Sequence, residues 1–171
     1  MAYTRTAISA NLTMLEQFRE MENSLREISS LVGRAGKILS TVGNAKPETY
    51  LSAIRAIRAL QEAWSHHLEV EHVLFPRMLC CKLQSGEFLK RLMERDQAIG
   101  KRLEAILSAP WPRSPHSGVQ SLKSAAGNIL NRILIQVECG QALILSAIPR
   151  MDRRMPDVER VESEPSELVT I

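Results

Sequence analysis

The residues best suited to chemistry lie in WSHHLEVEHVLFP, residues 64–76, where imidazoles and carboxylates interrupt an apolar helical pattern. On a helix that turns about 100° per residue, Glu71 falls in the middle of the apolar face and His67 falls beside it. His66 and Glu69 point to the opposite side. The His-x-x-x-Glu spacing therefore places one imidazole and one carboxylate a turn apart, both facing inward, as a metal site on a bundle helix requires.

A carboxylate at the centre of an apolar face must be paired, protonated or bound to a cation, because burying it alone is costly. Two interpretations follow for this helix. In the first, His67 and Glu71 are ligands of a metal ion. In the second, they satisfy each other and an Arg or Asn of a neighbouring helix as a structural polar pair. The spacing alone does not decide between them, since His-x-x-x-Glu is common in helices.

The elements that position these residues are predicted to be helical. Hydrophobic residues make up 44% of the 171-residue chain and aromatic residues only 4%, which leaves little material for strands. The breaker-rich segments TVGNAKP and APWPRSPHSG separate helical patterns. The predicted helices cover residues 9–39, 47–81, 86–107 and 119–150. Long helices with short connections pack antiparallel, so we predict an all-α, up-down-up-down antiparallel four-helix bundle.

We expect one domain, residues 1–151, followed by an acidic, disordered tail at 152–171. From Met155 onward the chain has five acidic residues and one basic residue, a net charge of −4, which leaves +7 on the remainder of a chain whose total is +3. The basic residues of the domain are scattered and have few aromatic neighbours. No nucleic-acid interface is therefore expected.

The cysteines and the hydropathy pattern indicate in which cellular compartment the protein is expected. Three cysteines, two of them adjacent, form no CxxC pair and are typical of free thiols in a reducing environment. No apolar run reaches the ~18 residues of a membrane span, and the N-terminus lacks the pattern of a signal peptide. We therefore expect a cytoplasmic protein that does not enter a membrane.

The segment HLEVEHVLFP, residues 67–76, resembles the second-helix motif of the hemerythrin and HHE cation-binding family. This resemblance implies a four-helix bundle that holds a non-haem di-iron centre. It implies one histidine ligand from the first helix, His-x-x-x-Glu from the second, a histidine from the third, and a histidine with a carboxylate from the fourth. The likeness extends over residues 9–150, but only the second-helix motif is specific.

The fourth helix lacks the ligands that the resemblance implies. A shift of 69 residues superposes it on the second helix with matching apolar positions. Under that shift Gln136 takes the place of His67, and Gly140 takes the place of Glu71. Glycine has no side chain with which to bind a metal, so both fourth-helix ligands are absent.

The third and first helices also depart from the implied pattern. In DQAIGKRL, Asp96 stands where a histidine is implied, and it could supply one oxygen ligand. In SLREISSLV, Leu25 stands at the first-helix position, although Glu22 borders the same face and could substitute. The expected remnant consists of His67, Glu71 and Asp96, with Gln136 or Glu22 as a further candidate.

These observations favour a protein that is not an enzyme, because the sequence has no nucleophile-base pair, phosphate loop or CxxC set. The first candidate function is a regulatory or protein-interaction domain: a hemerythrin-like bundle that has lost most di-iron ligands, binds no cofactor, and engages a protein partner or a second copy. Asp96, His67, Glu71 and Gln136 would then form a buried polar network that must be satisfied internally.

The alternative function is that of a cation-dependent sensor or storage protein. A single iron or zinc ion would occupy the residual metal site formed by His67, Glu71 and Asp96, as in mononuclear sites with one histidine and two carboxylates. Low occupancy is expected, because the other implied ligands are missing. Reversible oxygen binding is not expected, since a di-iron centre needs several histidines together with bridging carboxylates.

Overall fold

A computed structural model describes residues 13–41, 47–109 and 115–154. Within these ranges the chain forms four helices and no strand: α1 (Met14–Thr41), α2 (Pro47–Cys80), α3 (Gly86–Ser108) and α4 (Pro115–Arg154). The prediction of an all-α protein with four helices is therefore confirmed. Residues 155–171, which make up most of the predicted tail, lie outside the described residues.

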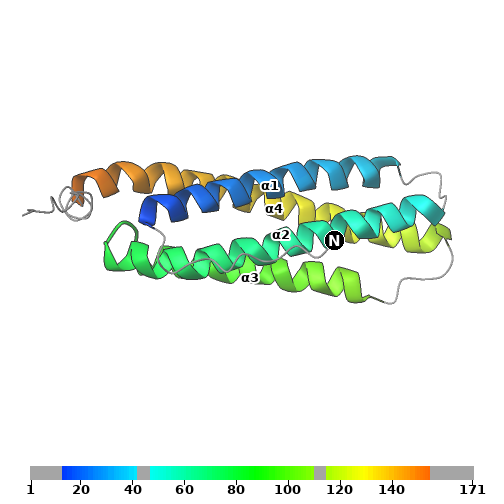
Figure 1. Cartoon of the computed structure of the whole chain (residues 1–171). Coiled ribbons are helices and arrows are strands. Elements are labelled where there is room, and N and C mark those ends of the chain that lie inside the picture. Colours follow the sequence, from blue (N-terminus) through cyan, green and yellow to red (C-terminus); the bar gives the residue numbers. More distant parts are fainter. Residues whose placement is uncertain (1–12, 42–46, 110–114, 155–171) are drawn as a thin grey trace, which may run out of the picture.

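The four helices lie side by side along one long direction (Figure 1). α1 packs against α2 and α4, and α3 also packs against α2 and α4, whereas α2 and α4 touch each other little. Every helix contributes fully buried side chains to one core, among them Leu25, Trp64, Leu103 and Ile133. This arrangement explains why apolar residues recur every three or four positions in each helix.

Local capping sequences determine where α1 and α3 begin. Before α1, the Thr13 N–H donates to Glu16 Oε2 at 2.8 Å, and the Glu16 N–H donates to Thr13 Oγ1 at 3.2 Å. This capping box satisfies amide groups that have no partner inside the helix, so α1 begins at Met14, later than the predicted residue 9. Ser85 caps α3, since its Oγ accepts a hydrogen bond from the Phe88 N–H at 3.2 Å.

The fourth helix is longer than predicted at both ends. It begins at Pro115 rather than near residue 119, and it ends at Arg154 rather than near residue 150. Proline fits the first helical turn because the amide hydrogen that it lacks would have no partner there. Residues 152–154, which were assigned to the tail, are therefore helical.

One segment of α4, Gln120–Met151, is by length and composition apolar enough to cross a membrane, with a mean hydropathy of 1.2 in its best 18-residue window. The segment is not an uninterrupted apolar run, because it contains the charged residues Lys123, Arg132, Glu138 and Arg150. The other helices bury 44% of that window. A helix in the core of a bundle needs the same composition, because its apolar stripe faces its neighbours.

The contact between α1 and α4 is close at Gly140. A Cβ atom at this position would lie 2.9 Å from Leu25 Cδ1 and 3.2 Å from Leu25 Cδ2. Leu25 is fully buried. The Leu25 side chain therefore occupies the space that a side chain at position 140 would need, and the glycine serves close packing rather than lining a cavity.

We expect Gly140→Ala to lower the free energy of unfolding, because an overpacked core loses about 1–3 kcal/mol. Gly127→Ala is the matched control, since a Cβ there would meet no atom within 4 Å. The control should raise the free energy of unfolding by about 0.5–1 kcal/mol, the usual helix gain of alanine over glycine. Chemical denaturation of both variants measures the difference.

A double-mutant cycle tests the contact itself. In a Leu25→Ala background, Gly140→Ala should cost less than it does in the unaltered chain, because the atoms that crowd position 140 are gone. Strictly additive effects of the two substitutions would contradict the packing described for α1 and α4.

Candidate metal centre

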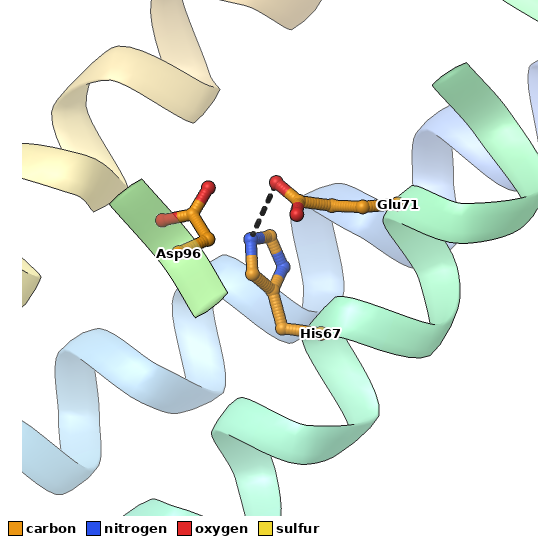
Figure 2. Close-up of side chains that lie close together, drawn as sticks. All are labelled: His67, Glu71 and Asp96. Carbon is orange, nitrogen blue, oxygen red and sulfur yellow. Dashed lines mark ion pairs between the residues drawn. The ribbon is translucent and has the colours of Figure 1, made fainter. Parts of the chain in front are cut away.

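Three ionisable side chains meet in the core between α2 and α3. Figure 2 shows His67 and Glu71 on one helix and Asp96 on another, with their polar ends directed toward one another. The exposed fractions of the three residues are 2%, 1% and 1%. One ligating atom from each residue lies within 4.8 Å of the other two. A group of this composition, one nitrogen and two carboxyl ligands, can hold a metal ion.

Helical spacing brings the α2 residues together. His67 and Glu71 are four positions apart, so their side chains lie on one face, and His67 Nε2 is 3.4 Å from Glu71 Oε1. Two ligands of a tetrahedral zinc ion are about 3.3 Å apart, given bonds of about 2.0–2.1 Å. The α2 pair therefore already has the separation that two such ligands need.

Trp64 fixes the position of α3 against α2. Its indole N–H donates to the main-chain carbonyl of Asp96 at 2.9 Å. The indole also packs against the His67 imidazole, with ring centroids 5.4 Å apart and planes tilted by 52°. The fully buried Trp64 side chain thus fixes the position of Asp96 along α2 and the orientation of the His67 ring.

Gln136 brings α4 into the cluster. Its side-chain amide, only 6% exposed, donates from Nε2 to Asp96 Oδ1 at 2.7 Å. Asp96 is therefore held from two sides, through its main chain by Trp64 and through its carboxyl group by Gln136. Two buried partners of this kind fix a ligand before any ion binds.

The cluster is only partly satisfied by hydrogen bonds among the described residues. Both carboxyl oxygens of Glu71 and Nδ1 of His67 are buried and have no hydrogen-bond partner there. Unpartnered polar atoms in a core are expensive, and a carboxylate is the most expensive of them. Asp96 and Gln136 are thus joined by a hydrogen bond, whereas Glu71 has the nearby His67 imidazole but no hydrogen bond from the described residues.

Burial sets the protonation of the three groups. It lowers the pKa of His67 to about 4, against an opposing effect of the nearby Asp96 charge. It raises the pKa of Glu71 to about 7. It raises the pKa of Asp96 to about 8, and the Glu71 charge adds to that shift. At neutral pH the imidazole is neutral, as a metal ligand must be, and the two carboxyl groups are partly protonated, so a cation that binds them displaces protons.

Glu22 does not join the cluster. Its side chain is 44% exposed and forms an ion pair with Arg26, one turn further along α1, at 2.5 Å. The suggestion that Glu22 replaces a first-helix ligand is therefore wrong. A border position on a helical wheel leaves the side chain free to turn either way, and here the arginine draws it toward solvent. Leu25, as predicted, presents an apolar side chain to the core.

Two features of this region were not foreseen. His66 was placed on the far side of α2, yet it is half-buried against α1, with Nε2 3.1 Å from Glu20 Oε1. Gln17 and Ser24 of α1 are also buried, and their side-chain polar atoms have no hydrogen-bond partner among the described residues. Their burial could have been predicted from the sequence, because Gln17 and Ser24 are polar residues at positions of the apolar face of α1.

Comparison of the chain with models of protein families, with curated proteins and with solved structures gave no match. The chain is a four-helix protein with a buried His-Glu-Asp cluster, and the resemblance to hemerythrins remains a prediction from the sequence.

The metal-free protein should lose stability as the pH rises from about 4.5 to 8, between the unfolded and folded pKa values of Glu71 and Asp96. Glu71 and Asp96 have raised pKa values in the folded state, so over this range the unfolded chain binds fewer protons and alkali favours unfolding. His67 acts in the opposite direction, but only between about pH 4 and 6.5, because its pKa is lowered. Glu71→Gln should reduce the loss by roughly 2–3 kcal/mol.

Melting curves recorded with a chelator across this pH range provide the measurement. Glu104→Gln, at an exposed position of α3, is the control and should leave the pH profile unchanged. Identical pH profiles for Glu71→Gln and the unaltered chain would show that Glu71 does not titrate in the core as described.

Proposed function

We propose that this chain is a non-enzymatic regulatory protein of the hemerythrin-like type, in which a single iron or zinc ion binds at His67, Glu71 and Asp96. One observation carries the proposal: these three buried side chains place their ligand atoms within 4.8 Å, while both oxygens of Glu71 have no hydrogen-bond partner among the described residues. A divalent cation would satisfy this cluster, since it can replace the protons of the two carboxyl groups and bind the neutral imidazole at the same time.

The proposed architecture is an up-down-up-down antiparallel bundle. Its support is the packing of each helix against the next one in the chain, together with short connections. The connection between α2 and α3 consists only of residues 81–85. Within it, Lys82 has a φ of 52°, in the left-handed region, and the Leu83 side chain is fully buried. A turn this short reverses the direction of the chain.

The residues around the cluster favour one ion over two. On the α1 side, Leu25 fills the space beside Gly140, so neither position offers a ligand. On α4, Gln136 uses its amide nitrogen to donate to Asp96, so that atom cannot bind a metal. The three remaining ligands are enough for one ion with an open or water-filled position, and a second ion would have no ligands of its own here.

Burial of the ligands argues for sensing or storage rather than catalysis. All three ligands are 1–2% exposed, which leaves no surface at the cluster on which a substrate could lie. Bound iron or zinc would add charge and cross-link α2 to α3, which stabilises the bundle. A protein partner or a second copy of the chain, in the cytoplasm, would then recognise the stabilised form.

A metal-free interaction domain is the second candidate. The raised pKa values of Glu71 and Asp96 favour it, because protons alone can neutralise the two carboxyl groups at neutral pH. The Gln136 hydrogen bond to Asp96 already satisfies part of the network. In this case the bundle would act through its surface and through a protein partner.

Titration of the metal-free protein with zinc and, without oxygen, with iron(II) separates the two candidates. We expect one ion per chain, release of protons on binding, and at 100 times the dissociation constant a gain of about 2.7 kcal/mol in the free energy of unfolding. His67→Ala should abolish binding. His66→Ala, the adjacent histidine outside the cluster, should bind metal as the unaltered chain does.

The outcomes are distinct. Absence of stoichiometric metal by elemental analysis, together with no thermal shift on titration, would leave the metal-free interaction domain. Two irons per chain with oxo-to-iron charge-transfer bands would contradict the single-ion site and point to ligands that the described residues do not supply.

A further inference from the structure

A second candidate site lies on the surface between α3 and α4. It is a groove of about 290 Å³ whose lining includes Arg95, Ile99 and Arg102 of α3 and Arg132, Ile135 and Gln136 of α4. The three arginines are exposed, whereas Ile99 and Gln136 are buried and form the floor. The groove therefore combines a cationic rim with an apolar wall and one amide group.

The arginines of this groove lack the carboxylate partners that neutralise arginines elsewhere on the same helices. Arg26 on α1 and Arg91 on α3 each pair with a glutamate four residues earlier, Glu22 and Glu87. Among the residues that the structure describes, no such ion pair involves Arg95, Arg102 or Arg132. The positions three and four residues on either side of each groove arginine hold only Arg, Leu, Ala, Ile, Asn or Gln.

The geometry concentrates positive charge at one place. Arg95 and Arg102 are seven residues apart, two turns along the same face of α3, and Arg132 approaches from α4. Three uncompensated guanidinium groups around one groove repel one another, and an anion placed among them removes that repulsion. Guanidinium groups also bind carboxylates and phosphates through paired hydrogen bonds.

The apolar residues define the rest of the ligand. Ile135 is 59% exposed at the edge of the groove. Covering this apolar surface with a ligand would be favourable, because it removes hydrocarbon from water. Ile99 continues this apolar surface to the floor. A ligand with a short hydrocarbon part would cover both isoleucines while its charged end meets the arginines. The volume suits a molecule of this modest size.

We propose that the α3–α4 groove is a binding site for a small organic anion, a carboxylate or phosphate monoester with a short apolar chain. The site goes beyond the cation centre and does not depend on it. Gln136 separates the two, since it lines the groove and also donates to Asp96 in the core. Binding in the groove is therefore to be measured with a chelator present, so that its outcome is independent of any metal.

Calorimetric titration with hexanoate and with hexyl phosphate tests the proposal and distinguishes the two kinds of head group. At least one should bind saturably at one molecule per chain. 1-Hexanol, which has the chain without the charge, and inorganic phosphate, which has the charge without the chain, should each bind at least tenfold more weakly, because each lacks one of the two contacts.

Substitutions locate the site. Arg102→Gln and Arg132→Gln should each weaken binding about fivefold, the effect of one exposed charge pair. Ile135→Glu should abolish binding, because the new carboxylate would form ion pairs with the groove arginines in place of the ligand. All three positions are exposed, so the bundle should fold normally. Arg34→Gln, the same charge change at an exposed position of α1, is the control and should leave affinity unchanged.

Absence of saturable binding for both anions would overturn the proposal. Equal affinity for hexanoate and 1-hexanol would also overturn it, since the arginines would then contribute nothing. The same holds for equal weakening by Arg34→Gln and Arg102→Gln, which would show that only the overall charge of the protein matters.

Discussion

The burial of two carboxyl groups beside one imidazole is the constraint on which the rest of this structure depends. Glu71 and Asp96 lie in a core made almost entirely of apolar side chains, where an ionised pair would lose hydration and repel. Positive charge or protons must therefore enter with them. The fold supplies part of the answer, since Trp64 and Gln136 hold Asp96 from two sides. Glu71 lies beside His67, but its oxygens accept no hydrogen bond from the described residues, and this makes the cluster a candidate for cation binding.

The inward orientation of His67, Glu71 and Asp96 was predictable from sequence, because the turn angle of a helix fixes which residues share a face whatever the helix packs against. Their mutual distance was not predictable in the same way. It depends on how far α3 is shifted along α2, and that shift is tied to the hydrogen bond from the Trp64 indole to the Asp96 carbonyl. A contact between residues 32 positions apart leaves no mark on local periodicity.

Features at the edges of helices were harder to predict for a different reason. The pairing of Glu22 with Arg26, and of His66 with Glu20, depends on side-chain rotamers at positions that border two faces. The start of α1 at Met14 depends on a capping box, in which Thr13 and Glu16 exchange two hydrogen bonds. By contrast, the exchange of an implied ligand for Gly140 was visible in the sequence. The structure adds that Leu25 fills the resulting space, so the two positions act as one packing unit.

Gln136 is the boundary between the surface groove and the interior of the bundle, with its amide toward Asp96 and its side chain in the groove lining. Anything that travels between solvent and Asp96 along this path, whether a proton, a water molecule or an ion, must wait for that amide to rotate aside. Such a rotation breaks one hydrogen bond and requires no helix to unfold. Exchange along this path would therefore depend on one side-chain rotation and not on the free energy of unfolding.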